Sequence, residues 1–193
     1  MKLIKDLWNE RYENLDTAWD IGHISTPLKE YFKQLENKNI KILIPGCGNA
    51  YEAEYLYELG FKQVYLIDWA EKALNNFQKR NPKFPKSQLI CDDFFKHQGQ
   101  YELIIEQTFF CAIPPDLRED YLIQMKKLLA KNGKLVGLLF NDKLCNNRPP
   151  FGGKKSAYIP LFSKHFNQVS MEKAYNSIPS RIDRELFIKI ENK

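Results

Sequence analysis

The chain has 193 residues, is 44% hydrophobic and carries a formal net charge of +5, which suits a single domain over residues 1–193 that buries on the order of 70% of its unfolded surface. Its lysines are scattered without a basic stripe interleaved with aromatic residues, which argues against nucleic-acid binding. No segment approaches the ~18 apolar residues of a membrane span. The four cysteines show neither zinc nor disulfide spacing, so we expect reduced cysteines and no metal. We further expect a cytoplasmic monomer.

Apolar segments of strand length alternate along the chain with longer segments of helical period. In chain order we expect the end of a helix at 31–37, a strand at 40–44, a helix at 51–59, a strand at 64–67, a helix at 70–80, strands at 88–91 and 103–106, a helix at 116–130, and strands at 134–140 and 186–190. Asn132-Gly133 is expected to end the helix at 116–130, because glycine tolerates the left-handed conformation that terminates helices. This alternation predicts an α/β fold with a mostly parallel central sheet and helices on both faces.

The most informative stretch is the turn Gly46-Cys47-Gly48, which follows an apolar strand and precedes a helix. Glycines let the backbone pass close to a ligand, and the N-terminus of the next helix offers unpaired N–H groups. Tyr51 replaces the third glycine of the dinucleotide fingerprint, so a cofactor without a pyrophosphate fits better. Asp68 ends the next strand, where doubly wound folds place the acceptor for two ribose hydroxyls; the alternative is that Asp68 caps the following helix.

The strand at 88–91 is followed by another candidate binding segment, Asp92-Asp93-Phe94. Ligands of open α/β sheets lie outside the carboxyl ends of the strands. A carboxylate here can accept hydrogen bonds from an adenine amino group while Phe94 packs on the ring. The alternative is that Asp92 or Asp93 caps a turn.

The strand at 103–106 is followed by polar and then aromatic residues, an order that suits a reaction pocket. Glu106 and Gln107 supply the polar groups, and Phe109 and Phe110 supply aromatic walls. Either phenylalanine is equally compatible with an ordinary core position. Cys111 has no histidine nearby in sequence to activate it, so we expect a small buried thiol and no nucleophile.

The segment 145–153 is a polar loop that contains two prolines and a pair of glycines. Loops of this kind often act as lids, and an ordinary surface loop is the alternative.

Several motifs occur together: Trp8 and Trp19 within Trp-x-x-x-Tyr and Trp-Asp-x-Gly, Ile44-Pro45-Gly46-Cys47-Gly48, Asp68, Asp93, the run from Thr108 to Ile113, and Pro149-Pro150-Phe151. In this combination the chain resembles the S-adenosylmethionine-dependent methyltransferases of the thiopurine S-methyltransferase superfamily, particularly the thiol and halide branch. The resemblance runs from Trp8 to the C-terminus. It implies a Rossmann-like class I methyltransferase fold in which an N-terminal helical lid, residues 1–30, closes over the cofactor.

The resemblance further implies S-adenosylmethionine as the cofactor and a small-molecule methyl acceptor. The glycine turn would contact the methionine and ribose portion, Asp68 the ribose hydroxyls, and Asp93 the adenine. Indole faces of the lid would favour the cationic sulfonium by about 0.5 to 2 kcal/mol per contact; otherwise the two tryptophans anchor an amphipathic helix. On this basis we expect cofactor binding by Trp8, Trp19, Gly46, Gly48, Asp68, Trp69, Asp93, Phe94 and Glu106, and acceptor binding by Gln107, Phe109, Phe110 and Phe151.

Methyl transfer from a sulfonium is an in-line displacement in which charge is neutralised when the acceptor is an anion. Alignment and exclusion of water then supply much of the acceleration, and we assign no catalytic base. We therefore expect methyl transfer to a thiol, a thiopurine or a halide. The alternatives are another small-molecule acceptor, a nucleic-acid methyltransferase, a nicotinamide-dependent oxidoreductase and a non-catalytic binding module.

The chain departs from the family pattern at three places, one of which is Asn147-Arg148 in place of the usual glycine pair before Pro149-Pro150. Halide-type members commonly show Gly-Cys-Gly-x-Gly-x-Asp, where this chain has Ala50 and Glu52. Many relatives have an Asp-Tyr pair before the Phe-Phe run, where this chain has Glu106-Gln107. The motif therefore does not rank halide, thiol and thiopurine.

Overall fold

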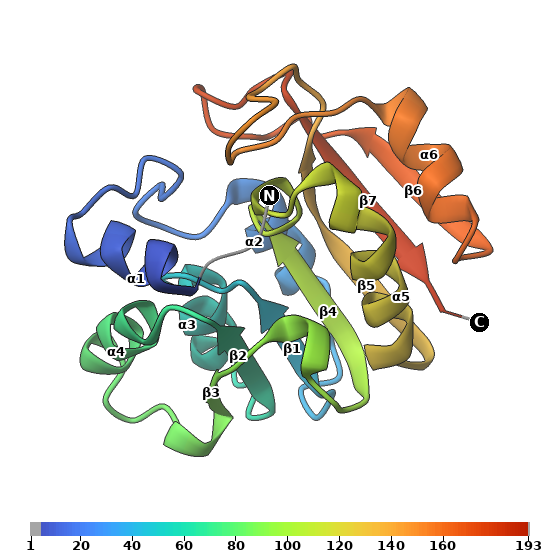
Figure 1. Ribbon diagram of the computed structural model, residues 1–193. Coiled ribbons are helices and arrows are strands. Elements are labelled where there is room, and N and C mark those ends of the chain that lie inside the picture. The colour runs from blue at the N-terminus through green and yellow to red at the C-terminus, as the bar shows by residue number, and fades with distance from the viewer. Residues whose placement is uncertain (1–4, 193) are drawn as a thin grey trace.

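The protein, for which we use a computed structural model, is described over residues 5–192 (Figure 1). Residues 1–4 of the expected lid and Lys193 lie outside this range. The described chain forms a seven-stranded sheet in the order β3-β2-β1-β4-β5-β7-β6. The strands are β1 (Ile42–Pro45), β2 (Val64–Asp68), β3 (Leu89–Cys91), β4 (Tyr101–Gln107), β5 (Leu129–Phe140), β6 (Gln168–Lys173) and β7 (Glu185–Glu191). The pairs among β1 to β5 are parallel, whereas β7 runs antiparallel to both β5 and β6.

The described chain has six α-helices, of which the third, fourth and fifth connect successive parallel strands as crossovers. They are α1 (Lys5–Glu13), α2 (Thr26–Lys33), α3 (Tyr51–Glu58), α4 (Glu71–Arg80), α5 (Arg118–Leu128) and α6 (Lys155–Ser163), with short 3-10 turns at η1 (Lys86–Gln88), η2 (Phe94–Lys96), η3 (Phe110–Ala112) and η4 (Pro115–Leu117). Within residues 5–192, none of these helices has the length and apolar character needed to cross a bilayer.

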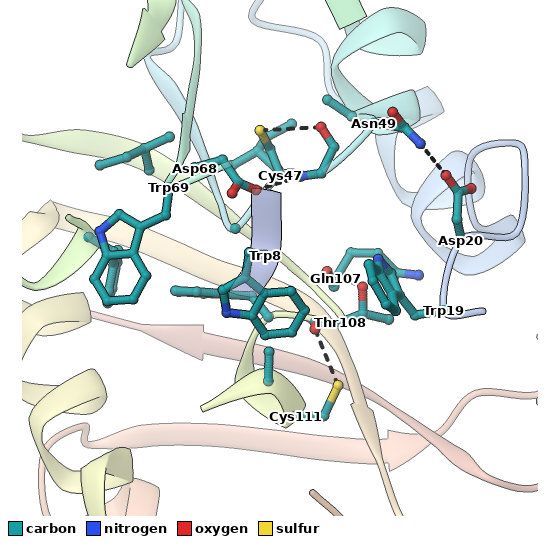
Figure 2. Close-up of a pocket in the computed structure, with 18 of the residues that line it drawn as sticks. Trp8, Trp19, Asp20, Cys47, Asn49, Asp68, Trp69, Gln107, Thr108 and Cys111 are labelled. Atoms are coloured by element: carbon teal, nitrogen blue, oxygen red, sulfur yellow. Dashed lines mark hydrogen bonds between the residues drawn. The ribbon is translucent and has the colours of Figure 1, made fainter. Parts of the chain in front are cut away.

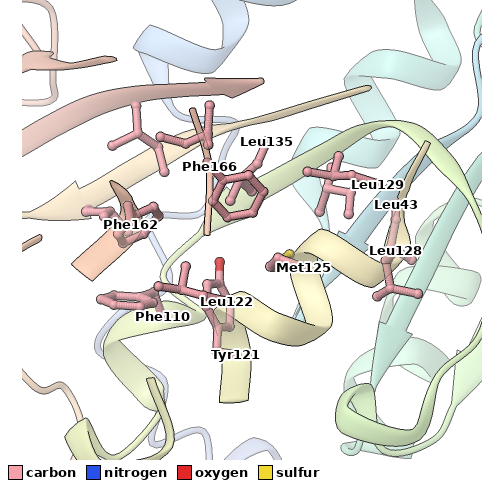
Figure 3. Packing of buried hydrophobic residues seen from close by; sticks show 14 of the residues in the cluster. Leu43, Phe110, Tyr121, Leu122, Met125, Leu128, Leu129, Leu135, Phe162 and Phe166 are labelled. Carbon is pink, nitrogen blue, oxygen red and sulfur yellow. The ribbon is translucent and has the colours of Figure 1, made fainter. Parts of the chain in front are cut away.

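Two hydrophobic clusters cover the two faces of the sheet, because successive residues of a strand point to opposite faces. Leu43 and Ile104 belong to the cluster that packs against α5 and α6, as the close-up of Met125 and its neighbours shows (Figure 3). Ile42 and Ile105 belong to the second cluster, which packs against α2, α3 and α4. Helices on both faces of a mostly parallel sheet match the expected fold class.

Every expected helix and strand occurs, with shifted ends, but the sequence reading omitted α6 and β6. Pro160 lies inside α6, where it would usually end a helix, and most residues of β6 are exposed, so the strand lacks an apolar run.

The expected helix stop at Asn132-Gly133 is wrong. α5 already ends at Leu128, and both residues lie within β5. Asn132 adopts the left-handed conformation with φ 61°. A Cβ added at Gly133 would lie 2.9 Å from the carbonyl oxygens of Ala130 and Tyr101. Gly133 therefore permits a close approach between β5 and β4, where their register shifts.

The segment 5–24, which we call the lid, comprises α1 and the chain that leads to α2. Figure 1 shows α1 beside α4, on the side of the sheet away from β6 and β7. The backbone N–H of Lys72 in α4 donates to Asn9 Oδ1 at 3.2 Å. The lid thus packs on the parallel half of the sheet, next to the ends of β1 and β2.

Candidate active site

A pocket lies at the carboxyl ends of β1, β2 and β4, with the lid across it (Figure 2). Ten of the thirteen expected site residues line it: Trp8, Trp19, Gly46, Gly48, Asp68, Trp69, Asp93, Phe94, Gln107 and Phe109. The structure therefore joins residues from the lid, the glycine turn and three strand ends in one cavity, at the place where open α/β sheets bind ligands.

The glycine turn after β1 lies directly under two aromatic side chains, and only glycine leaves room for them. Gly46 and Gly48 have φ of 55° and 53°, a left-handed conformation that glycine adopts without strain. A Cβ at Gly46 would overlap the Phe109 ring, and one at Gly48 would overlap the Tyr12 hydroxyl. Ala50 is held at φ 54° just before α3.

Asp68 ties this turn to the end of β2. Its Oδ2 accepts from the Gly48 N–H and its Oδ1 from the Ala70 N–H, both at 2.8 Å. Burial raises the pKa of the Asp68 carboxyl, while these hydrogen bonds act in the opposite direction. Each carboxylate oxygen has two acceptor sites, so the helix-capping reading and the ribose reading of Asp68 are compatible.

The lid brings three aromatic side chains and a guanidinium to the pocket. Trp19 packs edge-on against Trp8 and Tyr12, with ring centroids 5.6 and 5.7 Å apart. The Arg11 guanidinium lies 4.4 Å above the centre of the Trp19 ring and 5.5 Å from that of Trp8. Sequence reasoning missed Arg11, which sits one helical turn after Trp8 and pairs with Asp16 at 2.9 Å. The two indoles thus already attract one cation, and their contact with a sulfonium stays a prediction.

Glu106 does not reach the pocket wall, which corrects the expectation for this residue. It is fully buried beneath the pocket, where Oε1 accepts from the backbone N–H groups of Phe109 and Phe110 and Oε2 accepts from the Tyr121 hydroxyl, at 2.7 to 2.8 Å. Burial raises its pKa to about 7, against the effect of these three hydrogen bonds. Glu106 holds the turn that carries Gln107 and Phe109 into the pocket.

Phe110 and Phe151 also lie away from the wall, and the core reading left open for Phe110 holds. Phe110 packs against Tyr121 with ring centroids 5.1 Å apart (Figure 3). The Phe151 N–H donates to the Cys111 carbonyl at 2.6 Å, and Arg118 donates to the carbonyl of Phe151. The expected lid loop is thereby fixed on the core and presents its prolines, Pro149 and Pro150, to the pocket. Sequence reasoning missed both prolines as wall residues.

The turn after β4 is strained where it lines the pocket. Thr108 has φ 58°, which is costly for a β-branched residue. The Oε1 of the neighbouring Gln107 is buried without a hydrogen-bond partner among residues 5–192. Gln107 and Trp19 both line this pocket (Figure 2). An unsatisfied acceptor that lines a cavity is suited to a ligand donor.

Asp93 shows the turn-capping role given as its alternative, whereas Cys111 is the buried thiol that we expected. Asp93 Oδ1 accepts from the Phe95 N–H at 2.9 Å, which caps η2, although Asp93 still lines the pocket. Cys111 is buried, its thiol donates to the Thr108 carbonyl at 3.2 Å, and burial raises its pKa to about 12. A thiol of such high pKa is a poor nucleophile. Across the described chain, no three His, Cys, Asp or Glu side chains are grouped so that they could hold a metal ion.

The chain is similar in sequence to known methyltransferases. A family model described as thiopurine S-methyltransferase matches residues 3–185. Probable thiol methyltransferase 2 of Arabidopsis thaliana is 28% identical over 163 residues, which cover 80% of this chain and 72% of that protein. Thiocyanate methyltransferase 1 of Brassica oleracea is 28% identical over 185 residues, which cover 92% and 81%.

Solved structures share the fold. The 1,6-didemethyltoxoflavin-N1-methyltransferase of Burkholderia thailandensis superposes with a TM-score of 0.78 at 13% identity, over 98% of this chain and 87% of that one. Magnesium protoporphyrin IX methyltransferase of Synechocystis gives 0.73 at 12% identity, over 100% and 99%. These similarities confirm the Rossmann-like class I methyltransferase fold.

Because Tyr12 of the lid contacts Gly48 of the glycine turn, we expect substitutions at these two positions to have coupled effects on the free energy of unfolding. Gly48→Ala should lower the free energy of unfolding by about 2 kcal/mol or more, from left-handed strain and overlap with the Tyr12 hydroxyl. Tyr12→Phe removes only the overlapping oxygen, because the next ring atom is 3.6 Å away, and should restore about 1 kcal/mol in the Gly48→Ala background. Urea denaturation of the four variants measures this coupling. Additive effects would show that Tyr12 does not cover the turn in solution.

Because the pKa of Glu106 is raised, we expect the free energy of unfolding to depend on pH. The folded pKa of Glu106, at about 7, exceeds the ordinary value of 4.5, so the folded state binds the proton more tightly. The contribution of Glu106 to the free energy of unfolding should therefore be largest below pH 4.5 and fall by about 3 kcal/mol as the pH rises to about 7. Glu106→Gln keeps an oxygen for the two N–H groups and should flatten this slope in urea denaturation at several pH values. The exposed Glu58→Gln is the control, and an equal slope in wild type and Glu106→Gln would contradict the assignment.

Proposed function

The chain belongs to the thiopurine S-methyltransferase family and is thus a methyltransferase; we propose that it transfers the methyl group of S-adenosylmethionine to a small soft nucleophile, a thiol, a thiopurine or a halide. The observation that carries the proposal is one cavity in which the glycine turn, the Asp68 carboxylate and the indoles of the lid meet. Membership of a methyltransferase family argues against the alternative of a nicotinamide-dependent oxidoreductase. Tyr51, which stands at the position of the third glycine of the dinucleotide fingerprint, lines the pocket.

The residues of the pocket fit this cofactor. The left-handed glycines leave room for a ligand to approach the backbone, and Asp68 retains acceptor sites for two hydroxyl groups. Asp93 and Phe94 stand beside the cavity for the adenine, and Trp69 is in the same wall. Trp8 and Trp19 offer aromatic faces to a positive charge. When bound, S-adenosylmethionine supplies an electrophilic methyl group on a sulfonium.

The acceptor side is formed by Gln107, Phe109, Pro149 and Pro150. Their apolar surfaces would exclude water from an anionic nucleophile, and the buried Gln107 oxygen would receive a hydrogen bond from an acceptor or cofactor N–H. None of these groups needs to move a proton when the nucleophile arrives as an anion. The chain's contribution is therefore alignment, which supplies up to ~7–11 kcal/mol in well-oriented reactions.

The proposal also covers the class of substrate, the cellular compartment and the oligomeric state. The relatives act, by their names, on thiols and thiocyanate, and the scattered positive charge of this chain gives no footprint for a polyanion. We place its action on small molecules in the cytoplasm, as a monomer.

A methyl-transfer panel tests the proposed function. Labelled S-adenosylmethionine is offered with iodide, hydrosulfide, thiocyanate, an aromatic thiol and a thiopurine, and binding of S-adenosylhomocysteine is measured by calorimetry alongside. We expect transfer to at least one of these soft nucleophiles. Binding of S-adenosylhomocysteine without transfer would move the acceptor to another class, and absence of binding would overturn the assignment of the glycine turn.

Asp68 gives a sharper test of the cofactor site. Asp68→Ala should weaken S-adenosylhomocysteine binding by about 1–3 kcal/mol, because charge-assisted hydrogen bonds to the ribose are lost. The control is Glu54→Gln, which changes a partly exposed carboxylate that pairs with Arg80 at 3.4 Å. Calorimetry on both folded variants decides, and unchanged affinity in Asp68→Ala would remove Asp68 from the cofactor site.

A further inference from the structure

Arg181 links the C-terminal part of the chain to the lid. It lies in the segment 174–184 between β6 and β7, and only 7% of its surface is exposed. Its Nη2 donates to the backbone carbonyl of Trp19 at 2.6 Å, across 162 positions of sequence. Its Nη1 donates to Glu185 Oε1 at 3.3 Å, and Glu185 is only 4% exposed. A buried guanidinium therefore holds one point of the lid.

The guanidinium has little freedom to leave this position. Its carbon lies 5.4 Å from the centre of the Phe140 ring at the end of β5. The Arg181 N–H donates to the Ile178 carbonyl, and the Arg181 carbonyl accepts from the Arg184 N–H, so the loop backbone is closed around it. Burying an ion pair costs desolvation that the attraction only partly offsets, which makes such a pair weak evidence for stability. The direction in which it points is the more informative property.

The carbonyl that Arg181 binds belongs to the residue that organises the aromatic residues of the lid. The Trp19 indole contacts both Trp8 and Tyr12 edge-on, and Tyr12 covers the glycine turn. At the next residue of the chain, the Asn49 side chain donates to the Asp20 carboxylate, as Figure 2 shows. The Trp19–Asp20 segment is thus held both by the β6–β7 loop and by the glycine turn.

We propose that Arg181 is a positioning residue that fixes the Trp19 indole over the pocket and so couples the β6–β7 loop to closure of the lid. Glu185 sets the direction of the guanidinium. The proposal rests on the proposed function only for the identity of the cofactor beneath Trp19. On this proposal the antiparallel end of the sheet influences cofactor binding, although it is far from the glycine turn in sequence.

Arg181→Lys should loosen the lid, because a single ammonium on a different stem cannot reproduce the two divergent guanidinium contacts. Hydrogen exchange of backbone amides in the lid should become roughly tenfold faster in the ligand-free protein, and S-adenosylhomocysteine should bind roughly tenfold more weakly. Exchange in β1, β4 and β5 should stay as in wild type. The matched control is Arg184→Gln in the same loop, which removes a half-exposed guanidinium bound to Asp142 at 2.6 Å.

A second variant separates positioning from stability. Arg181→Met with Glu185→Leu replaces the buried pair by apolar side chains of similar size, a change that often leaves a fold as stable or more stable. This variant should still show faster exchange in the lid and weaker binding of S-adenosylhomocysteine. It decides the matter even if Arg181→Lys fails to fold, since wild-type exchange in the lid of this stable variant would overturn the proposal.

The Trp19→Ala background tests the route through the indole. If Arg181 acts by placing that indole, Arg181→Lys should weaken S-adenosylhomocysteine binding much less when the indole is already absent. Equal weakening in both backgrounds would contradict the proposal and leave Arg181 a structural residue. Failure of wild type to bind S-adenosylhomocysteine would refute the proposed function alone, because exchange in the ligand-free lid reports on Arg181 without any cofactor.

Discussion

The Asp68 carboxylate accepts from the N–H groups of Gly48 and Ala70 and so ties the end of β1 to the end of β2. The two strands pair in parallel, with Pro45 opposite Ile67, so their chains leave the sheet side by side and need a common support. This link holds the glycine turn in the left-handed conformation over which Tyr12 packs. The pocket floor, the start of α4 and the seat of the lid all depend on it.

A second carboxylate has the same supporting role at the end of β4. Glu106 holds the turn after that strand from beneath and keeps the strained Thr108 in place. Its neighbour Gly137 belongs to this arrangement, because a Cβ there would overlap the Glu106 backbone. Acids at strand ends thus serve in two ways, with Asp68 open to the pocket and Glu106 sealed below it. The raised pKa of Glu106 is the electrostatic consequence of that sealing.

The lid shows how a binding site can depend on segments with no local relation to it. α1 brings aromatic residues and Arg11 over the cavity, and the segment that follows it is held at Asp20 by Asn49 of the glycine turn and at Trp19 by Arg181 of the β6–β7 loop. The antiparallel strands β6 and β7, which lie away from the cofactor half of the sheet, thereby contribute to the closed pocket.

The sequence by itself determined the α/β architecture, the glycine turn and most of the pocket, since apolar periodicity and residues after strand ends are local properties. Gly46, Gly48, Asp68 and Phe109 could be placed at one edge of the sheet for that reason. Only the tertiary structure decided that Glu106, Phe110 and Phe151 face away from the cavity, because a side chain's direction after a turn depends on what packs behind it. The structure also revealed α6, the early end of α5 and Arg181, where a proline, a register shift and a contact across 162 residues override or escape any local pattern.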